Sequence, residues 1–259
     1  MHRPTFVSHG APTLPFENAA ARDFLCSLGA DPKPTAILMV SAHWETAVPM
    51  VNAVAVNETI HDFRGFPPEL YRLRYAAPGD VVLAERVAQL LSAVGLPTGI
   101  DRARGLDHGA WVPLMLAYPG ADIPVVQLSV QPDAGPVHHL AVGRALAPLM
   151  ADGVHVLASG SFTHDLSSFR QYADEQEPAW VTDFADWMDL ALSEGRVADL
   201  LDYRRFAPNA VRNHPTEEHL LPLFVALGAG GVPAKRLHVS TTYGVLRMDA
   251  YAFGGNGQV

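Results

Sequence analysis

The chain has 259 residues, of which 49% are hydrophobic and 17% charged, with a formal net charge of -9. This acidic balance excludes a nucleic-acid groove, which needs clustered Lys and Arg, and no apolar run approaches the roughly 20 residues that cross a bilayer. No linker divides the chain, so we expect a single domain over residues 1–259.

The cysteine content and the N-terminus bear on the compartment. The one cysteine, Cys26, cannot form a disulfide within the chain or a thiolate metal site alone, and we expect it to be a small buried residue. The first residues lack the long apolar segment of a secretory signal. We therefore expect a cytoplasmic protein without nucleic-acid or membrane partners.

The first buried strand of the chain ends beside a histidine. An extended segment over residues 6–8 leads to His9, and a helix is expected over residues 17–28. The continuous apolar run over residues 36–41 is typical of a parallel strand covered on both faces, and His43 follows it. Open α/β sheets bind ligands beyond the carboxyl ends of their strands, so His43 is a candidate for chemistry.

The remaining pattern alternates strands and helices. We expect strands over residues 51–56, 98–100, 125–130, 154–159, 237–241 and 245–253, and helices over residues 79–94, 111–117, 137–150, 179–193, 197–201 and from Pro215 to about 227. This order predicts an α/β fold, with three αβα layers around a central, mostly parallel mixed sheet. The last two strands predict an antiparallel hairpin at its edge.

Histidines are unusually frequent, and five of the twelve stand at expected strand ends or helix starts: His9, His43, His108, His164 and His219. One such histidine is more often structural, but five are harder to explain that way. A metal is the simplest reason to gather neutral imidazoles, and Zn²⁺, Fe²⁺ and Mn²⁺ all suit them. The chain has neither the HExxH motif nor the G-x-S-x-G nucleophile elbow.

The other histidines suggest simpler roles. His138 and His139 are expected at the surface or a helix flank, and His155 and His238 in structural positions. His214, before a proline, is expected to shape a helix entry. His61 lies in an aromatic loop over residues 57–68, a kind of segment that often closes over a site, and it is a candidate for substrate contact.

Six short motifs occur along the chain in a family-specific order. They are Ser8-His9-Gly10-Ala11-Pro12, Ser41-Ala42-His43-Trp44, Ile60-His61-Asp62-Phe63 with Gly65-Phe66-Pro67, Asp107-His108-Gly109-Ala110-Trp111, Ser159-Gly160 with His164, and Pro215-Thr216-Glu217-Glu218-His219 with Leu221-Pro222-Leu223. Together they resemble the class III extradiol ring-cleaving dioxygenases, and among these the 4,5-DOPA dioxygenase branch.

The resemblance implies roles for individual residues. His9, His43 and His219 would be the metal ligands, where better-known relatives use a glutamate as the third. His164 would act as an acid/base or as a fourth ligand in a resting zinc form, and His108 would face bound oxygen or substrate.

Further residues are candidates for supporting roles. Arg64 and Tyr243 are candidates for substrate contact, together with His61. Arg64 departs from the family pattern, which has an uncharged or aromatic residue there. Asp107 and Asp165 are candidates for orienting the histidines beside them.

The resemblance also implies the reaction. At a non-haem metal, O₂ would open the ring of a catechol such as DOPA and give a muconic semialdehyde. This reaction belongs to aromatic compound metabolism. Fe²⁺ would be the active metal, and Zn²⁺ would bind the same imidazoles but cannot cycle electrons. Two other classes stay open: a zinc-dependent hydrolase that activates water with the same histidines, and a non-catalytic metal- or ligand-binding protein.

Overall fold

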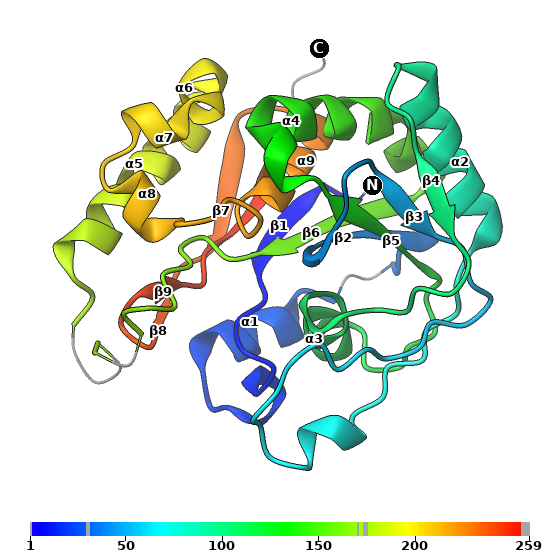
Figure 1. Cartoon of the computed structure of the whole chain (residues 1–259), viewed down its shortest axis with the longest axis horizontal. Helices are drawn as coiled ribbons and strands as arrows, with labels where there is room; N and C mark the ends of the chain where they lie inside the picture. The colour runs from blue at the N-terminus through cyan, green and yellow to red at the C-terminus, as the bar shows by residue number, and fades with distance from the viewer. Residues whose placement is uncertain (1, 30–31, 170, 173–175, 255–259) are drawn as a thin grey trace.

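An eight-stranded mixed sheet runs through the middle of the computed structural model, in the order β4-β3-β5-β2-β6-β1-β10-β7 (Figure 1). The structure describes residues 2–29, 32–169, 171–172 and 176–254. The strands are β1 Thr5–Ser8, β2 Ala36–Glu45, β3 Met50–Asn52, β4 Gly99–Asp101, β5 Val125–Val130, β6 Val154–Gly160, β7 Ala234–His238, β8 Thr241–Thr242, β9 Leu246–Arg247 and β10 Ala250–Phe253. β8 and β9 form a separate two-stranded sheet.

The helices are interspersed among the strands as far as β6, after which several helices follow one another before β7. They are α1 Ala20–Ser27, α2 Val81–Ala93, α3 His108–Ala117, α4 Gly135–Leu146, α5 Ala179–Glu194, α6 Val197–Leu201, α7 Tyr203–Phe206, α8 Ala210–Asn213 and α9 Leu221–Gly230. Short 3-10 turns lie at η1 Leu14–Phe16, η2 Leu70–Arg72, η3 Pro132–Ala134 and η4 Ala147–Asp152. Among the described helices, none combines the length and hydropathy of a membrane-spanning segment.

The centre of the sheet is parallel and antiparallel pairs flank it on both sides, while the edge strand β4 pairs in parallel with β3. β2 and β1 both pair in parallel with β6, and β5 pairs in parallel with β2. β10 joins β1 and β7 in antiparallel register, and β3 is antiparallel to β5. The predicted α/β class, mostly parallel sheet and antiparallel edge pair are confirmed.

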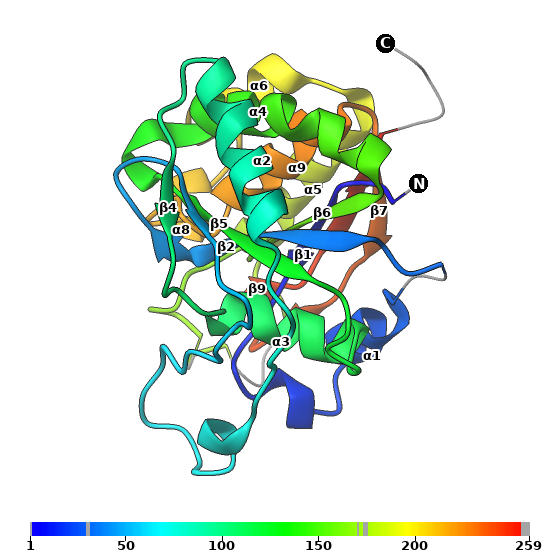
Figure 2. The same ribbon diagram turned by 90° about the vertical axis from the view of Figure 1, so that its right-hand side faces the viewer.

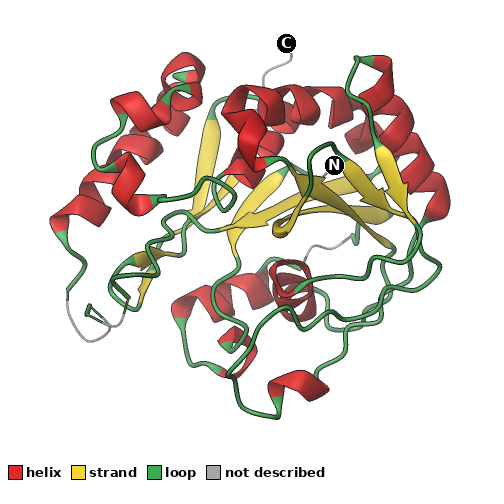
Figure 3. Cartoon of the chain, in the orientation of Figure 1, coloured by secondary structure: helices red, strands yellow, loops and turns green. Residues whose placement is uncertain are grey.

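The two faces of the sheet are covered by different helices (Figures 2 and 3). Leu38 and Val40 of β2 pack into a core shared with α2, α4, α5 and α9. Ile37 and Met39, which point the other way, pack into a core shared with α1 and α3. This alternation is why the whole run is apolar, since both faces of a central strand are buried.

The helix expected to begin near Pro215 begins instead at Leu221, and Pro222 lies in its first turn. The peptide of His219 explains the shift, because its carbonyl accepts a hydrogen bond from the Ser161 N–H at the end of β6. The turn before α9 is thus fixed to the sheet rather than to the helix. The strand expected over residues 245–253 is divided into β9 and β10.

Two predictions of burial were wrong. Cys26 is exposed, because α1 buries Ala21 and Leu25 and the residue after Leu25 points away from the core. His139, expected at the surface or a helix flank, is buried within α4. Its Nδ1–H donates to the Gly135 carbonyl at 2.7 Å, and its Nε2 accepts from the Gln131 N–H at 3.1 Å.

We predict that His139 makes the protein acid-labile. Burial lowers the pKa of His139 from 6.5 to about 4, so the unfolded chain takes up the proton first. The neutral, buried form of His139 contributes to the free energy of unfolding. This contribution is fully present above pH 6.5 and is lost as the pH falls toward 4. Urea unfolding at pH 7 and at pH 5 should show that His139→Gln loses about 2 kcal/mol less than the wild type over this interval. Parallel losses would contradict it.

Candidate metal centre

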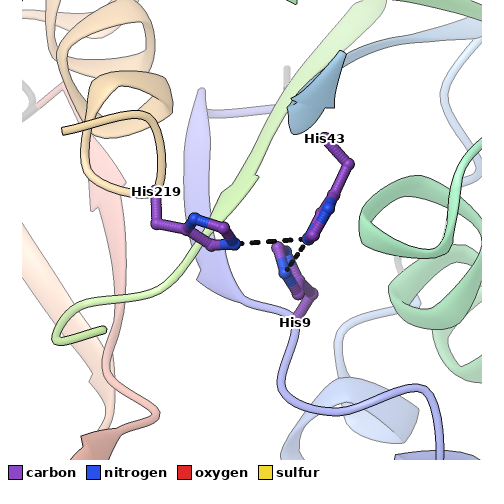
Figure 4. Close-up of side chains that lie close together, drawn as sticks. All are labelled: His9, His43 and His219. Atoms are coloured by element: carbon purple, nitrogen blue, oxygen red, sulfur yellow. Dashed lines mark hydrogen bonds between the residues drawn. The ribbon is translucent and has the colours of Figure 1, made fainter. Parts of the chain in front are cut away.

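Three histidines from distant parts of the chain converge at the carboxyl edge of the sheet (Figure 4). His9 follows β1, His43 lies near the end of β2, and His219 lies in the turn before α9. The Nε2 atom of His43 is 3.1 Å from that of His9 and 3.2 Å from that of His219. These are the three residues that the family resemblance implied as metal ligands.

The hydrogen bonds of His9 fix its tautomer. The hydroxyl of Ser159 donates its only proton to the Gly109 carbonyl at 2.5 Å. The same oxygen lies 2.9 Å from the His9 Nδ1, so it accepts a hydrogen bond from the N–H of that nitrogen. The Nε2 of His9 is therefore unprotonated and carries its lone pair toward the other two histidines.

His43 and His219 are oriented in the same way by carboxylates. The Nδ1 of His219 donates to the Glu218 Oε1 at 2.8 Å. The Nδ1 of His43 lies 3.4 Å from the Asp62 Oδ2. A carboxylate accepts but does not donate, so each ring carries its proton on Nδ1 and leaves Nε2 bare.

This arrangement fits a metal ion. Three bare nitrogen acceptors cannot hydrogen-bond to one another, whereas one cation satisfies all three. Nitrogen ligands about 2.1 Å from a common ion lie roughly 3–3.4 Å apart. Burial first, and neighbouring imidazoles second, lower the pKa of His9 and of His219 well below the ordinary value, so both rings stay neutral. Neutral imidazole is the form that binds metal.

Close packing holds the three rings in place. A Cβ on Gly109, in the first turn of α3, would lie 2.8 Å from His43 Cδ2 and 3.2 Å from His9 Cε1. Only glycine lets α3 approach the cluster this closely. The spacing of the rings therefore depends on the Asp107-His108-Gly109 segment as well as on the strands.

Asp62 connects the cluster to His108. Its Oδ1 accepts the backbone N–H of His108 and its Oδ2 accepts the Nδ1–H of the same residue, both at 2.9 Å. Burial opposes ionisation of this carboxyl, but the His108 hydrogen bonds outweigh it and lower its pKa to about 2. The sequence contained Asp62 within a motif, yet its role was missed because the loop position gave no sign of a partner.

His164 lies against the cluster from the opposite side. Its ring stacks on that of His219 with centroids 3.4 Å apart and planes 14° apart. Its Nδ1 is 4.0 Å from the Glu218 Oε1. Burial lowers the pKa of His164 to about 4, so its ring is neutral at physiological pH.

Two further groups of three could offer ligand atoms: His43 with Asp62 and His108, and His164 with Glu218 and His219. In each group the carboxylate already faces the Nδ1 of the histidines beside it. The trio of His9, His43 and His219 differs because its converging atoms are all acceptors.

A cavity of about 400 Å³ opens over the histidines. Its wall is mainly apolar and includes the side chains of Phe63, Phe66, Leu166, Phe169 and Leu246. His9, His43, His108, His164, His219 and Tyr243 also line it. The five histidines grouped from the sequence therefore share one chamber.

Other predicted residues lie elsewhere. His61 and Arg64 are not among the described residues that line this cavity. The His61 Nε2 lies 3.2 Å from the Leu73 carbonyl, and Arg64 is exposed. The loop path, which a sequence pattern does not specify, turns both away from the histidines.

The two aspartates expected to orient neighbouring histidines have other partners. Asp165 accepts hydrogen bonds from Ser167 and Ser168 rather than from His164. Asp107 caps the N-terminus of α3 and accepts from the hydroxyl of Ser41 at 2.6 Å. It thereby joins the helix that carries His108 to the strand that carries His43.

Comparison with known proteins gives consistent relatives. The model of a family described as the catalytic LigB subunit of aromatic ring-opening dioxygenase matches residues 18–254. A Beta vulgaris protein named 4,5-DOPA dioxygenase extradiol is 45% identical over 96% of this chain and 95% of its own length. An Escherichia coli K12 protein of the same name is 39% identical over 86% and 83%. The crystal structure of an uncharacterized Escherichia coli K12 protein matches with a TM-score of 0.81 and 33% identity, covering 98% of this chain and 100% of its own.

We predict that Asp62→Asn weakens metal binding roughly tenfold, because carboxylates that hold ligand histidines typically contribute this much to affinity. The affinity for Zn²⁺ would be measured by competition with a chelating dye. Asp165→Asn is the matched control, since the hydrogen bonds of this carboxylate to described residues are to Ser167 and Ser168. Equal affinities in both variants would refute a role for Asp62 in orienting His43.

Proposed function

The chain belongs to the family of the catalytic LigB subunit of aromatic ring-opening dioxygenases and is an extradiol dioxygenase, and we propose that it opens a DOPA-like catechol to a muconic semialdehyde at a ferrous ion. The observation that carries this proposal is the convergence of three unprotonated Nε2 atoms beneath an apolar cavity. His9, His43 and His219 are the residues that would hold the metal.

The identity of the metal follows from the chemistry required. When bound, Fe²⁺ would favour the ionised catechol and relay electrons between it and O₂, whereas Zn²⁺ has no redox chemistry. Imidazole ligands suit both ions, so the protein is expected to bind either. We also propose a cytoplasmic location, where reducing conditions would keep iron ferrous.

The cavity wall supports binding of an aromatic ring. Phe63 and Phe66 lie edge to face with centroids 5.2 Å apart on one side, and Phe169 and Leu246 line the same space. These side chains offer apolar surface to a ring and exclude water from it. Tyr243 also lines the cavity and is the proposed polar substrate contact.

Two histidines remain for proton transfer. His164 stacks beside His219 and faces the cavity, so its neutral ring can accept a proton from a catechol hydroxyl. His108 donates a hydrogen bond from its Nδ1–H to Asp62, which leaves its Nε2 as the nitrogen available to accept or release a proton. We propose that His164 is the first base and that His108 moves a proton later in the reaction.

We predict that only the iron form consumes oxygen. Metal-free protein would be loaded with Fe²⁺ or Zn²⁺ under anaerobic conditions and then given air and a panel of catechols. The Fe²⁺ form should take up O₂ and release a yellow ring-opened product, because ring cleavage requires electron transfer. Hydrolysis of an ester by the Zn²⁺ form, with no oxygen uptake by the Fe²⁺ form, would overturn the proposed function.

His164→Gln should retain iron but lower kcat by about 10²-fold to 10⁴-fold, the usual contribution of a general base. Iron content would be measured together with the steady-state rate. A kcat within twofold of the wild type would remove His164 from the proposed proton transfer.

A further inference from the structure

A second cavity of about 280 Å³ lies next to the one above the histidines. Gly10, Ala11 and Tyr243 line both cavities. Gly10 directly follows His9, so the second cavity begins within a few ångströms of a proposed metal ligand. The two cavities therefore adjoin along a shared wall.

The two cavities differ in chemistry. The first is walled mainly by aromatic and aliphatic side chains. The second is lined by polar residues as well: Glu17, Asn18, Ser240, Thr241 and Thr242. Among the described residues that line either cavity, Glu17 is the sole carboxylate, and none is Lys or Arg.

Tyr243 stands at the boundary between the cavities. It lies between β8 and β9, and its φ of 51° is in the left-handed region, as is that of Gly244 at 67°. A bulky aromatic residue seldom adopts this backbone conformation, which here belongs to the turn between the paired strands β8 and β9. Its ring meets the edge of Phe169, and its hydroxyl donates to the Glu17 Oε1 at 3.3 Å.

The Glu17 carboxylate is already held in position. Its Oε1 also accepts the hydroxyl proton of Thr13 at 2.5 Å. Both bonds are to the same oxygen, and the side chain is only half-buried, so a cation in the cavity can approach the carboxylate. An N⁺–H donor would gain a charge-assisted hydrogen bond there, and an anion would be repelled.

We propose that the second cavity is a subsite for the ammonium group of a catechol substituent, with Glu17 as its anionic partner and Tyr243 as the wall that directs the substituent. This inference rests on the proposed function for the position of the catechol ring. Within the proposed DOPA-like class, it makes Glu17 the residue that favours a substituent with an ammonium group over the same substituent without one.

The test measures binding without turnover. Zinc-loaded protein would be titrated in a calorimeter, without oxygen, with 4-(2-aminoethyl)catechol and with 4-ethylcatechol, which differ only by the amine. The wild type should bind the amine about tenfold more tightly. Glu17→Gln should reduce this ratio to about one, while Asp23→Asn, which removes an exposed charge on α1 outside the cavity, should keep the ratio of the wild type.

A measurement on the wild type alone covers the case in which Glu17→Gln does not fold. The advantage of the amine should shrink when the salt concentration is raised to about 0.5 M, because the ion pair is partly screened. Equal affinities for the two catechols in the wild type, or an unchanged ratio in folded Glu17→Gln, would overturn the subsite. Absence of oxygen uptake by the iron form would instead overturn the proposed function. The ratio of the two binding affinities is measured without turnover and tests the subsite separately.

Discussion

The site depends on one constraint, the protonation of three imidazoles. His9, His43 and His219 each turn Nδ1 toward an oxygen acceptor and leave Nε2 bare. Loss of any acceptor would free a ring to rotate or to change tautomer, and the common centre of lone pairs would disappear. The serine and two carboxylates that hold Nδ1 therefore matter as much as the rings themselves.

The fold supplies these acceptors through its parallel centre. β1 and β2 flank β6, so the residues at their carboxyl ends, His9 and His43, meet beside Ser159 of the middle strand. The turn before α9 reaches the same point because β6 holds the carbonyl of His219. Asp62 and α3 then close the site from the other side of the cluster.

The hydrophobic pattern of the sequence predicted the histidines that lie at strand ends. The arrangement of the residues in loops and turns depends on tertiary packing and was not predicted. The apolar runs before His9 and His43 placed both residues at the sheet edge, because that pattern depends on burial alone. The role of Asp62 depends on the path of a loop, which periodicity does not predict. Tyr243 lies in the turn between the last two predicted strands, and its backbone conformation could not be predicted from periodicity either. Its position at an expected helix start made His219 a candidate, and the family motifs then implied that it is a ligand. The helix itself was predicted to begin too early, so the turn that holds His219 was missed.

The position of the metal tests the central claim most directly. Crystals of the iron-loaded protein, grown without oxygen, would be measured at the iron absorption edge. We predict one anomalous peak about 2.1 Å from the Nε2 atoms of His9, His43 and His219. A peak among His43, Asp62 and His108, or among His164, Glu218 and His219, would contradict the assignment of the ligands.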